Sequence, residues 1–426
     1  MKYAILNFGC RVNHADSLRI EEDLRARGGT EAPSSAADVV VVNTCSVTAT
    51  ADQGARQTIR RIARENPSAR IVATGCYATR CEDEVAGLSP AVRVVRNADK
   101  PHFLDSLLRT SDLGPRASDL GGPCGRPIEP GVAGRTAFTI RAQTGCEEQC
   151  AYCIIPTTRG ASRSATIESL IADVERVADA GFKEVVVTGV HLGSYGRDLV
   201  PQTSLLTLLR ELDAVCGDVM FRVSSLEPMD CTPAIVDFVA RSGRFLPHFH
   251  LPLQHASNRM LEAMRRPYTL GYYRALVDSV IARLPHASIG SDMIVGFPGE
   301  TDDDFAANLE YLPSSPLTHL HVFPYSDRPG TVATSMRAKV HGSVVRDRAA
   351  RLRDIGVALS RRFRESQIGT VRPGLTLDDG TLVVTDNYLK VRIPPGLQRN
   401  VRVRVSVHRD GQDLLGAPLP ARSTSD

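Results

Sequence analysis

Short apolar runs alternate with amphipathic stretches along the first quarter of the chain. The apolar runs predict strands at 3–8, 39–43, 70–74 and 92–95, and the amphipathic stretches predict helices that include 15–27 and 52–65. Strands that alternate with helices are typical of a parallel sheet with helices on its faces. We therefore expect residues 1–110 to form an α/β domain.

A second series of the same kind extends from about residue 135 to residue 340. Its apolar runs predict strands at 137–141, 184–187, 219–223, 249–253, 288–294 and 319–323, and helical patterns at 166–180, 204–215 and 270–284 separate several of them. About six strand–helix units predict a partial (β/α)6 barrel. In such a barrel, functional residues belong at the carboxyl ends of the strands.

Composition changes mark the boundaries of these regions. A Gly- and Pro-rich stretch at 111–134 is predicted to be a linker. A helical pattern rich in arginine, from Arg346 to Arg364, ends the barrel region at about residue 365. The last region, 366–420, predicts a small all-β domain with strands at 382–384, 388–393 and 402–407.

Composition and charge narrow the functional classes. The net charge is only +3, so any contact with nucleic acid must come from local basic patches. The opening MKYAILNFGC resembles a strand rather than a signal peptide, and no run approaches the roughly 18 apolar residues of a membrane span. We expect a cytoplasmic protein without a membrane partner, whose ten cysteines serve as metal ligands, catalytic groups or core residues rather than in disulfides.

The most specific chemical signal is a group of three closely spaced cysteines. Cys146, Cys150 and Cys153 follow the first predicted barrel strand with the spacing C-x3-C-x2-C. Three thiolates can hold three irons of a 4Fe–4S cluster and leave the fourth iron open to a chelating ligand. A structural zinc ion is the alternative, but zinc takes four ligands, and no further Cys or His follows Cys153 at zinc-finger spacing.

This region resembles the radical S-adenosylmethionine superfamily. The resemblance implies that the cofactor's amino and carboxylate groups bind the open iron, and that reductive cleavage yields a 5′-deoxyadenosyl radical. Polar residues at the predicted strand ends are candidates for holding the cofactor, although each could instead be a cap or a turn. They are Tyr152, Thr188, Gly189, Ser225, Glu227, Gln254, Asp292, Gly296 and Glu300.

Three further cysteines are far apart in the sequence but occupy equivalent places. Cys10, Cys45 and Cys76 each follow a predicted strand of the first domain. Because the carboxyl ends of parallel strands meet at one edge of a sheet, we expect these thiols to converge there and hold a second 4Fe–4S cluster. The alternative is that they are small buried core residues, which is the common fate of a free cysteine.

The motifs FGCRVN, NTCSVT and TGCYA, together with TGCEEQCAYCIIPTTRG, resemble the radical S-adenosylmethionine methylthiotransferase family over nearly the whole chain. The resemblance implies a flavodoxin-like first domain with an auxiliary 4Fe–4S cluster, a radical barrel, and a C-terminal TRAM domain that holds RNA. It also implies two S-adenosylmethionine molecules, of which one methylates a sulfur at the auxiliary cluster and the other generates the radical. An electron donor such as flavodoxin or ferredoxin is expected.

Several basic residues are candidates for contact with the substrate or RNA. In the segment TDNYLKVRI and the strand after it, which resemble a TRAM domain, they are Lys390, Arg392, Arg402 and Arg404. The alternative for them is a solvated basic face. Arg159 and Arg163 follow the C-x3-C-x2-C loop, where they either meet substrate or cofactor or form ordinary ion pairs at a helix entry.

The family has three branches that differ in substrate. VVVTGVHLGSYG, MRRPYT and VFPYSDRPGT resemble the branch that modifies threonylcarbamoyladenosine beside the tRNA anticodon. LPLQHAS resembles the branch that modifies an aspartate of a ribosomal protein, and the third branch acts on isopentenyladenosine. A non-catalytic iron–sulfur protein that binds RNA or senses redox state is the alternative of another class. It would not require Glu227, Gln254 or the run GFPGE.

Overall fold

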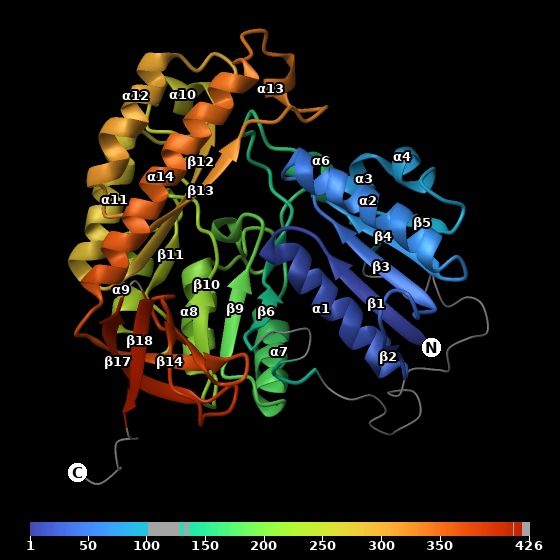
Figure 1. The fold of residues 1–426 in the computed structure, drawn as a ribbon, viewed down its shortest axis with the longest axis horizontal. Helices are drawn as coiled ribbons and strands as arrows, with labels where there is room; N and C mark the ends of the chain where they lie inside the picture. Colours follow the sequence, from blue (N-terminus) through green and yellow to red (C-terminus); the bar gives the residue numbers. More distant parts are fainter. Residues whose placement is uncertain (101–127, 132–135, 412, 420–426) are drawn as a thin grey trace. The chain divides into compact units, whose positions relative to one another are not determined.

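The computed structural model describes residues 1–100, 128–131, 136–411 and 413–419 (Figure 1). Most of the predicted linker at 111–134 and the last ten residues of the predicted first domain lie outside these ranges. The chain forms two compact units. The first contains Met1–Ile128, Gln143–Gln149 and Cys153–Arg163, and the second contains Glu129–Ala142, Cys150–Tyr152 and Ser164–Asp426.

The first unit is built on a five-stranded parallel sheet with the order β2-β1-β3-β4-β5. This order is that of flavodoxin-like folds, so the predicted α/β class is confirmed. The strands are β1 (Lys2–Asn7), β2 (Thr30–Glu31), β3 (Val39–Thr44), β4 (Arg70–Gly75) and β5 (Val92–Val95). The helices are α1 (Arg11–Ala26), α2 (Ala49–Glu65), α3 (Cys76–Arg80) and α4 (Glu82–Ala86).

Both faces of this sheet are buried, which explains its continuous apolar strands. Side chains of one strand alternate between the two faces. Val39 and Val41 pack with Leu24 of α1 in one core, whereas Val40 and Val42 belong to a second core that contains residues of α2 and α3. A strand covered by helices on both sides needs apolar residues at every position.

The second unit contains six parallel strands in two three-stranded sheets, β6-β9-β10 and β11-β12-β13. Two parallel bridges, Phe221–Phe245 and Ser225–His250, connect the sheets side by side. The result is the open, partial (β/α)6 barrel that the sequence predicts (Figure 1). Its strands are β6 (Phe138–Arg141), β9 (Glu184–Thr188), β10 (Met220–Val223), β11 (His248–His250), β12 (Ser288–Val295) and β13 (His319–Pro324).

The helices of this half-barrel begin at local sequence signals. Six of them have a Ser or Thr N-cap whose hydroxyl accepts a hydrogen bond from a backbone N–H of the first turn. Thr301 and Asp304 form a reciprocal capping box. These helices are α7 (Ile167–Asp179), α8 (Leu205–Ala214), α9 (Pro233–Arg241), α10 (Asn258–Ala263), α11 (Leu270–Arg283) and α12 (Asp302–Tyr311).

One barrel strand is shorter than predicted. The apolar run 249–253 predicts a five-residue strand, but β11 spans only His248–His250. Pro252 lies in the remaining part, and proline has no N–H to donate to a neighbouring strand. The chain leaves the sheet there and makes one further bridge, between Gln254 and Met293.

The C-terminal region is a closed five-stranded barrel reached through the helices α13 (Val332–Ser335) and α14 (Gly342–Ser366). Three strands were predicted: β15 (Leu382–Thr385), β16 (Lys390–Arg392) and β17 (Arg402–Asp410). The sequence analysis missed β14 (Val371–Leu377) and β18 (Asp413–Leu419), because each contains a glycine and a proline. In the described part of the chain, no helix is long and apolar enough to cross a membrane.

A buried arginine joins the C-terminal barrel to the half-barrel. Arg222 of β10 has a side chain only 1% exposed and forms an ion pair with Glu184 of β9 at 3.1 Å. It also donates to the carbonyl oxygen of Asp386 at 3.0 Å, and its guanidinium lies over the ring of Tyr388. Glu184 of the half-barrel therefore neutralises the charge of Arg222, and the C-terminal barrel accepts hydrogen bonds from the same guanidinium.

Replacing Arg222 with Ala is expected to destabilise the protein by about 3–5 kcal/mol, because Glu184 would remain buried without its partner. The free energy of unfolding, measured by urea denaturation, checks this. Replacing the exposed Arg404 with Ala serves as the control and should change stability by less than about 0.5 kcal/mol. Equal effects of the two changes would contradict the role assigned to Arg222.

Candidate active site

The first unit brings Cys10, Cys45 and Cys76 to one edge of its sheet. Cys10 follows β1, Cys45 follows β3 and Cys76 begins α3 directly after β4. The order of the sheet reverses between β1 and β3, and parallel sheets bind their ligands beside such a point, at the carboxyl ends of the strands. The three cysteines therefore lie at the same edge of the sheet, as the sequence predicts.

Glycines permit the close approach of the cysteine-bearing loops. Gly9 has a φ of +99°, and a Cβ atom at this position would lie 2.3 Å from the Sγ atom of Cys45. Gly75 has a φ of +96°, and a Cβ atom there would lie 2.1 Å from the carbonyl oxygen of Thr44. Any other residue would force these loops apart.

The three thiols influence one another electrostatically. Cys45 and Cys76 are buried, whereas Cys10 is exposed. Burial raises the pKa of the Cys45 thiol to about 12, and Cys10 and Cys76 add to the rise. The unliganded Cys45 is therefore a thiol at neutral pH, and a metal that binds it must displace the proton.

A network of buried charges lies beside these cysteines. Asp16 of α1 accepts hydrogen bonds from Lys100 at 2.7 Å and from Arg159 at 3.1 Å, and Arg159 also donates to Asn13. Burial opposes the charged form of Arg159, but Cys76, Asp16 and Cys10 outweigh it and raise the pKa of this guanidinium. Two cations thus share one carboxylate.

This surplus of positive charge fits an anionic iron–sulfur cluster. The Nε atom of Arg159 is buried and has no hydrogen-bond partner among the described residues. Asn97 directs its amide nitrogen toward the Sγ atom of Cys76 at 3.7 Å. A buried donor without a partner is costly, and a thiolate-bound cluster at the neighbouring cysteines would supply acceptors.

The sequence analysis left the role of Arg159 open between a substrate or cofactor contact and an ion pair. The structure shows a buried ion pair with Asp16, beside the Cys10–Cys45–Cys76 group. Arg163 is exposed on β8 (Arg163–Ser164). Asn13, Asp16 and Lys100 were not predicted, because no local pattern indicates partners so distant in the sequence.

The C-x3-C-x2-C loop lies between β7 (Gln143–Thr144) and α6 (Ile155–Arg159). Gly145 has a φ of +77°, and a Cβ atom there would lie 1.9 Å from the carbonyl oxygen of Ala161. The N–H of Cys146 donates to the carbonyl oxygen of Gly160 at 3.0 Å. The loop that begins with Cys146 is thus fixed against the segment that follows Cys153.

Cys150 is held by an arginine that the sequence analysis did not single out. Arg266 donates to the Sγ atom of Cys150 at 3.0 Å and forms an ion pair with Glu227. Burial raises the pKa of Tyr152 well above its ordinary value. Of the predicted cofactor residues, Glu227 pairs with the arginine that holds Cys150, and Tyr152 is affected by the charges of both Arg266 and Cys150. The motif MRRPYT contributes Arg266.

The other predicted strand-end residues have mixed surroundings. Thr188 ends β9 and is buried, and Gly189 follows it directly. Ser225 forms a hydrogen bond with the Nδ1 atom of His250 at 2.7 Å. Gln254 is a buried non-glycine residue with a φ of +69°, a strained conformation of the kind that is concentrated at functional sites.

The run GFPGE forms a tight loop after β12, and Glu300 closes it. The Glu300 carboxylate accepts from the N–H of Phe297 at 3.2 Å and pairs with Arg348 at 2.8 Å. Its side chain is 0% exposed, and burial raises its pKa although Arg348 opposes the rise. The carboxylate shapes the loop that contains Gly296, whose φ is +76°, and its contact with the cofactor stays a prediction.

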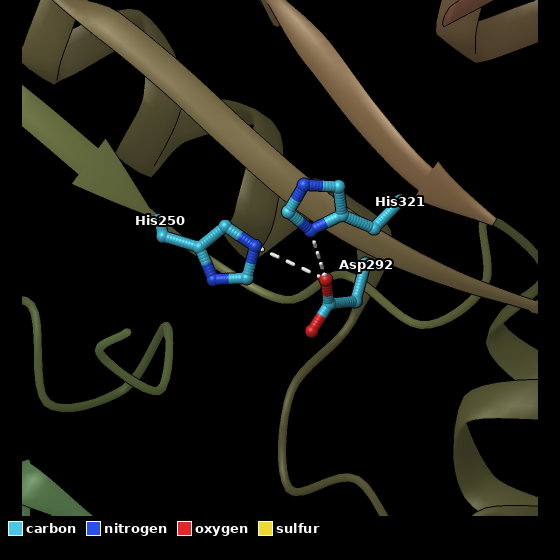
Figure 2. Close-up of side chains that lie close together, drawn as sticks. All are labelled: His250, Asp292 and His321. Atoms are coloured by element: carbon cyan, nitrogen blue, oxygen red, sulfur yellow. Dashed lines mark hydrogen bonds and ion pairs between the residues drawn. The ribbon is translucent and has the colours of Figure 1, made fainter. Parts of the chain in front are cut away.

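Asp292 was also expected to contact the cofactor, but its carboxylate faces two imidazoles (Figure 2). The Oδ1 atom lies 3.0 Å from Nε2 of His250 and 3.2 Å from Nδ1 of His321. Burial opposes the charged form of Asp292, but the contacts with the two histidines outweigh it and hold its pKa well below the usual range. Its partners come from the neighbouring strands β11 and β13.

The predicted RNA-binding residues of the C-terminal barrel divide into two groups. Lys390, Arg392 and Arg404 are exposed. Arg402, by contrast, forms an ion pair with Asp218 of the half-barrel at 2.6 Å and donates to the carbonyl oxygen of the same residue. The expectation that Arg402 contacts RNA stays a prediction, and in the structure its side chain pairs with Asp218.

Comparison with known proteins agrees with this geometry. Residues 2–96 match the model of "Uncharacterized protein family UPF0004", and residues 140–312 match that of the radical SAM superfamily. Among solved structures, the methyltransferase TsrM from Kitasatospora setae is similar in fold, with a TM-score of 0.56 over 78% of this chain and 75% of that one, at 15% identity. The chain is a radical S-adenosylmethionine enzyme.

Curated relatives define the family within this class. The threonylcarbamoyladenosine tRNA methylthiotransferase MtaB of Thermotoga maritima is 34% identical over 98% of this chain and 99% of its own. The MtaB of Aquifex aeolicus is 34% identical over 92% and 96%. The tRNA-2-methylthio-N(6)-dimethylallyladenosine synthase of Pelotomaculum thermopropionicum is 32% identical over 86% and 85%. This chain belongs to the radical S-adenosylmethionine methylthiotransferases, whose cofactors are S-adenosylmethionine and 4Fe–4S clusters.

Replacing Arg159 with Met is expected to weaken the auxiliary cluster on Cys10, Cys45 and Cys76 by about 10–100-fold, as the loss of an outer-sphere partner does at other metal sites. Iron and sulfide content, and the EPR spectrum of the reduced auxiliary cluster, measure the effect. Arg159→Lys, which keeps the charge, should retain more of the cluster. Arg163→Met is the matched control; if it behaves like Arg159→Met, the assigned role of Arg159 is wrong.

Proposed function

We propose that this protein attaches a methylthio group to carbon 2 of N6-threonylcarbamoyladenosine at position 37 of tRNA, next to the anticodon. The main observation is that one chain contains two groups of cysteines. One group follows the strands of a flavodoxin-like sheet, and the other forms a C-x3-C-x2-C loop after the first strand of a half-barrel. Relatives named for this modification, which match almost end to end, support the choice of substrate.

Two groups of cysteines would hold the clusters. Cys10, Cys45 and Cys76 would hold the auxiliary cluster, with Arg159 opposing its negative charge. The second group, Cys146, Cys150 and Cys153, would hold the cluster that binds S-adenosylmethionine. When bound, these groups and two S-adenosylmethionine molecules supply the methylthio group and the 5′-deoxyadenosyl radical.

Residues of the half-barrel would position S-adenosylmethionine. Arg266 binds both the Sγ atom of Cys150 and the carboxylate of Glu227. It would therefore hold Glu227, a predicted cofactor contact, close to the cluster ligand Cys150. The remaining candidates would complete the pocket at the carboxyl ends of the strands. They are Tyr152, Thr188, Gly189, Ser225, Gln254 and the Gly296 backbone.

The C-terminal barrel would hold the tRNA backbone. Lys390, Arg392 and Arg404 are exposed cations on it, and such groups contribute salt-dependent affinity for phosphates. The proposal places the enzyme in the cytoplasm, with a low-potential donor such as flavodoxin or ferredoxin supplying electrons.

Mass spectrometry of tRNA nucleosides tests the proposal. Cells that lack the protein should contain threonylcarbamoyladenosine without the methylthio group, and restoring the gene should restore the modified nucleoside. Restoring a Cys146→Ala variant should not, because the radical cluster would lose a ligand.

Other results of the same measurement would contradict the substrate or the class. Methylthiolation of isopentenyladenosine instead would move the protein to another branch of the family. Unchanged tRNA would make the ribosomal-protein aspartate the target to examine. A purified protein that forms no 5′-deoxyadenosine from S-adenosylmethionine and reductant would support the non-catalytic alternative.

A further inference from the structure

Three side chains from neighbouring strands of the half-barrel converge. His250 comes from β11, Asp292 from β12 and His321 from β13, and their ligand atoms all lie within 4.8 Å of one another (Figure 2). Asp292 is directly opposite His321 in the register of β12 and β13. The pairing of the sheet itself therefore brings the three groups together.

These side chains lie on the inner face of the half-barrel. Ser291, the residue before Asp292, forms a hydrogen bond at 3.2 Å with the hydroxyl of Tyr273 on the covering helix α11. Successive residues of a strand point to opposite faces, so Asp292 points away from the helices. The side chain of His250 is 11% exposed, that of Asp292 is 23% exposed and that of His321 is 55% exposed. The group is therefore accessible from the side of His321.

Both spacings of the Asp292 carboxylate to the imidazoles match those of neighbouring donors on one metal ion. With metal–ligand bonds of about 2.0–2.2 Å, two donors of one ion lie about 3.0–3.5 Å apart. The Asp292 Oδ1 atom lies 3.0 Å from His250 Nε2 and 3.2 Å from His321 Nδ1. The Nε2 atom of His250 is buried, and its close polar neighbour among the described residues is this Asp292 oxygen.

The orientation of His250 is fixed in the way that metal sites require. Its Nδ1 atom forms a hydrogen bond with Ser225 at 2.7 Å, which leaves Nε2 directed toward Asp292. Histidine ligands commonly use their second nitrogen in this way, and the bond fixes the ring and its tautomer. Ser225 would then support a metal ligand.

The group contains none of the six cysteines and no residue of the GFPGE loop. Asp292 lies four residues before Gly296, which follows the last residue of β12. At roughly 3.3 Å per residue, this spacing corresponds to about 13 Å along an extended chain.

We propose that His250, Asp292 and His321 bind one divalent first-row transition metal ion, of the Zn²⁺ or Fe²⁺ type. Two imidazoles and one carboxylate form a donor set that these ions accept, and three protein ligands leave positions for water. The bound ion would join three adjacent strands across the inner face. The proposal does not depend on the methylthiotransferase reaction.

Anaerobic holoenzyme with both iron–sulfur clusters loaded is titrated with Co²⁺, so that the cluster cysteines are already occupied. One equivalent per chain should bind and give visible d–d absorption, and an equivalent of Zn²⁺ should displace it. His321→Ala, a change at a half-exposed side chain, should abolish this equivalent. Asp292→Asn, which keeps the shape of the side chain, should abolish it as well.

His319→Ala is the matched control. His319 lies two residues before His321 on the same strand, with its ring 5.5 Å from that of His321 but outside the three-residue group. This variant should bind Co²⁺ like the wild type. Iron content and thermal unfolding of each variant check that the fold and the clusters persist. The proposal is overturned if the wild type binds no Co²⁺, or if His321→Ala and Asp292→Asn bind as much Co²⁺ as the wild type.

Discussion

Parallel strand pairing is the constraint on which this structure depends. It turns residues that are distant in sequence into neighbours, because every strand delivers the residue after its last pair to the same edge of the sheet. Cys10, Cys45 and Cys76 become a group in this way. The same pairing places Asp292 opposite His321 in the second unit.

Charge then determines what such an edge can hold. Beside the strand-end cysteines, Lys100 and Arg159 share the single carboxylate of Asp16, so the surroundings favour an anionic group. Inside the half-barrel, two imidazoles instead surround the Asp292 carboxylate, and each neutral ring has one nitrogen lone pair to offer. An iron–sulfur cluster suits the first environment, and a single metal ion suits the second.

The sequence predicts what is encoded locally. The alternation of apolar and amphipathic runs predicts most strands and helices of both units and the strand-end positions of Cys10, Cys45 and Cys76. The resemblance of the motifs around these cysteines implies the flavodoxin-like class. The partners of Arg159 and Arg266 could not be predicted, because these contacts join residues far apart in the sequence and depend on burial. For a related reason, no pattern indicates that Arg348 and two backbone N–H groups bind the Glu300 carboxylate.

The interleaving of the two units has a consequence for synthesis on the ribosome. The first unit includes Gln143–Gln149 and Cys153–Arg163, and Arg159 supplies a buried partner for Asp16 of α1. Domains of a nascent chain generally fold from the amino terminus onward. Here Asp16 and Asn13 of the first unit lack their hydrogen bonds from Arg159 until Arg159 has left the exit tunnel. By then Cys146, Cys150 and Cys153 have also been made, so all six cysteines are present when the first unit can close.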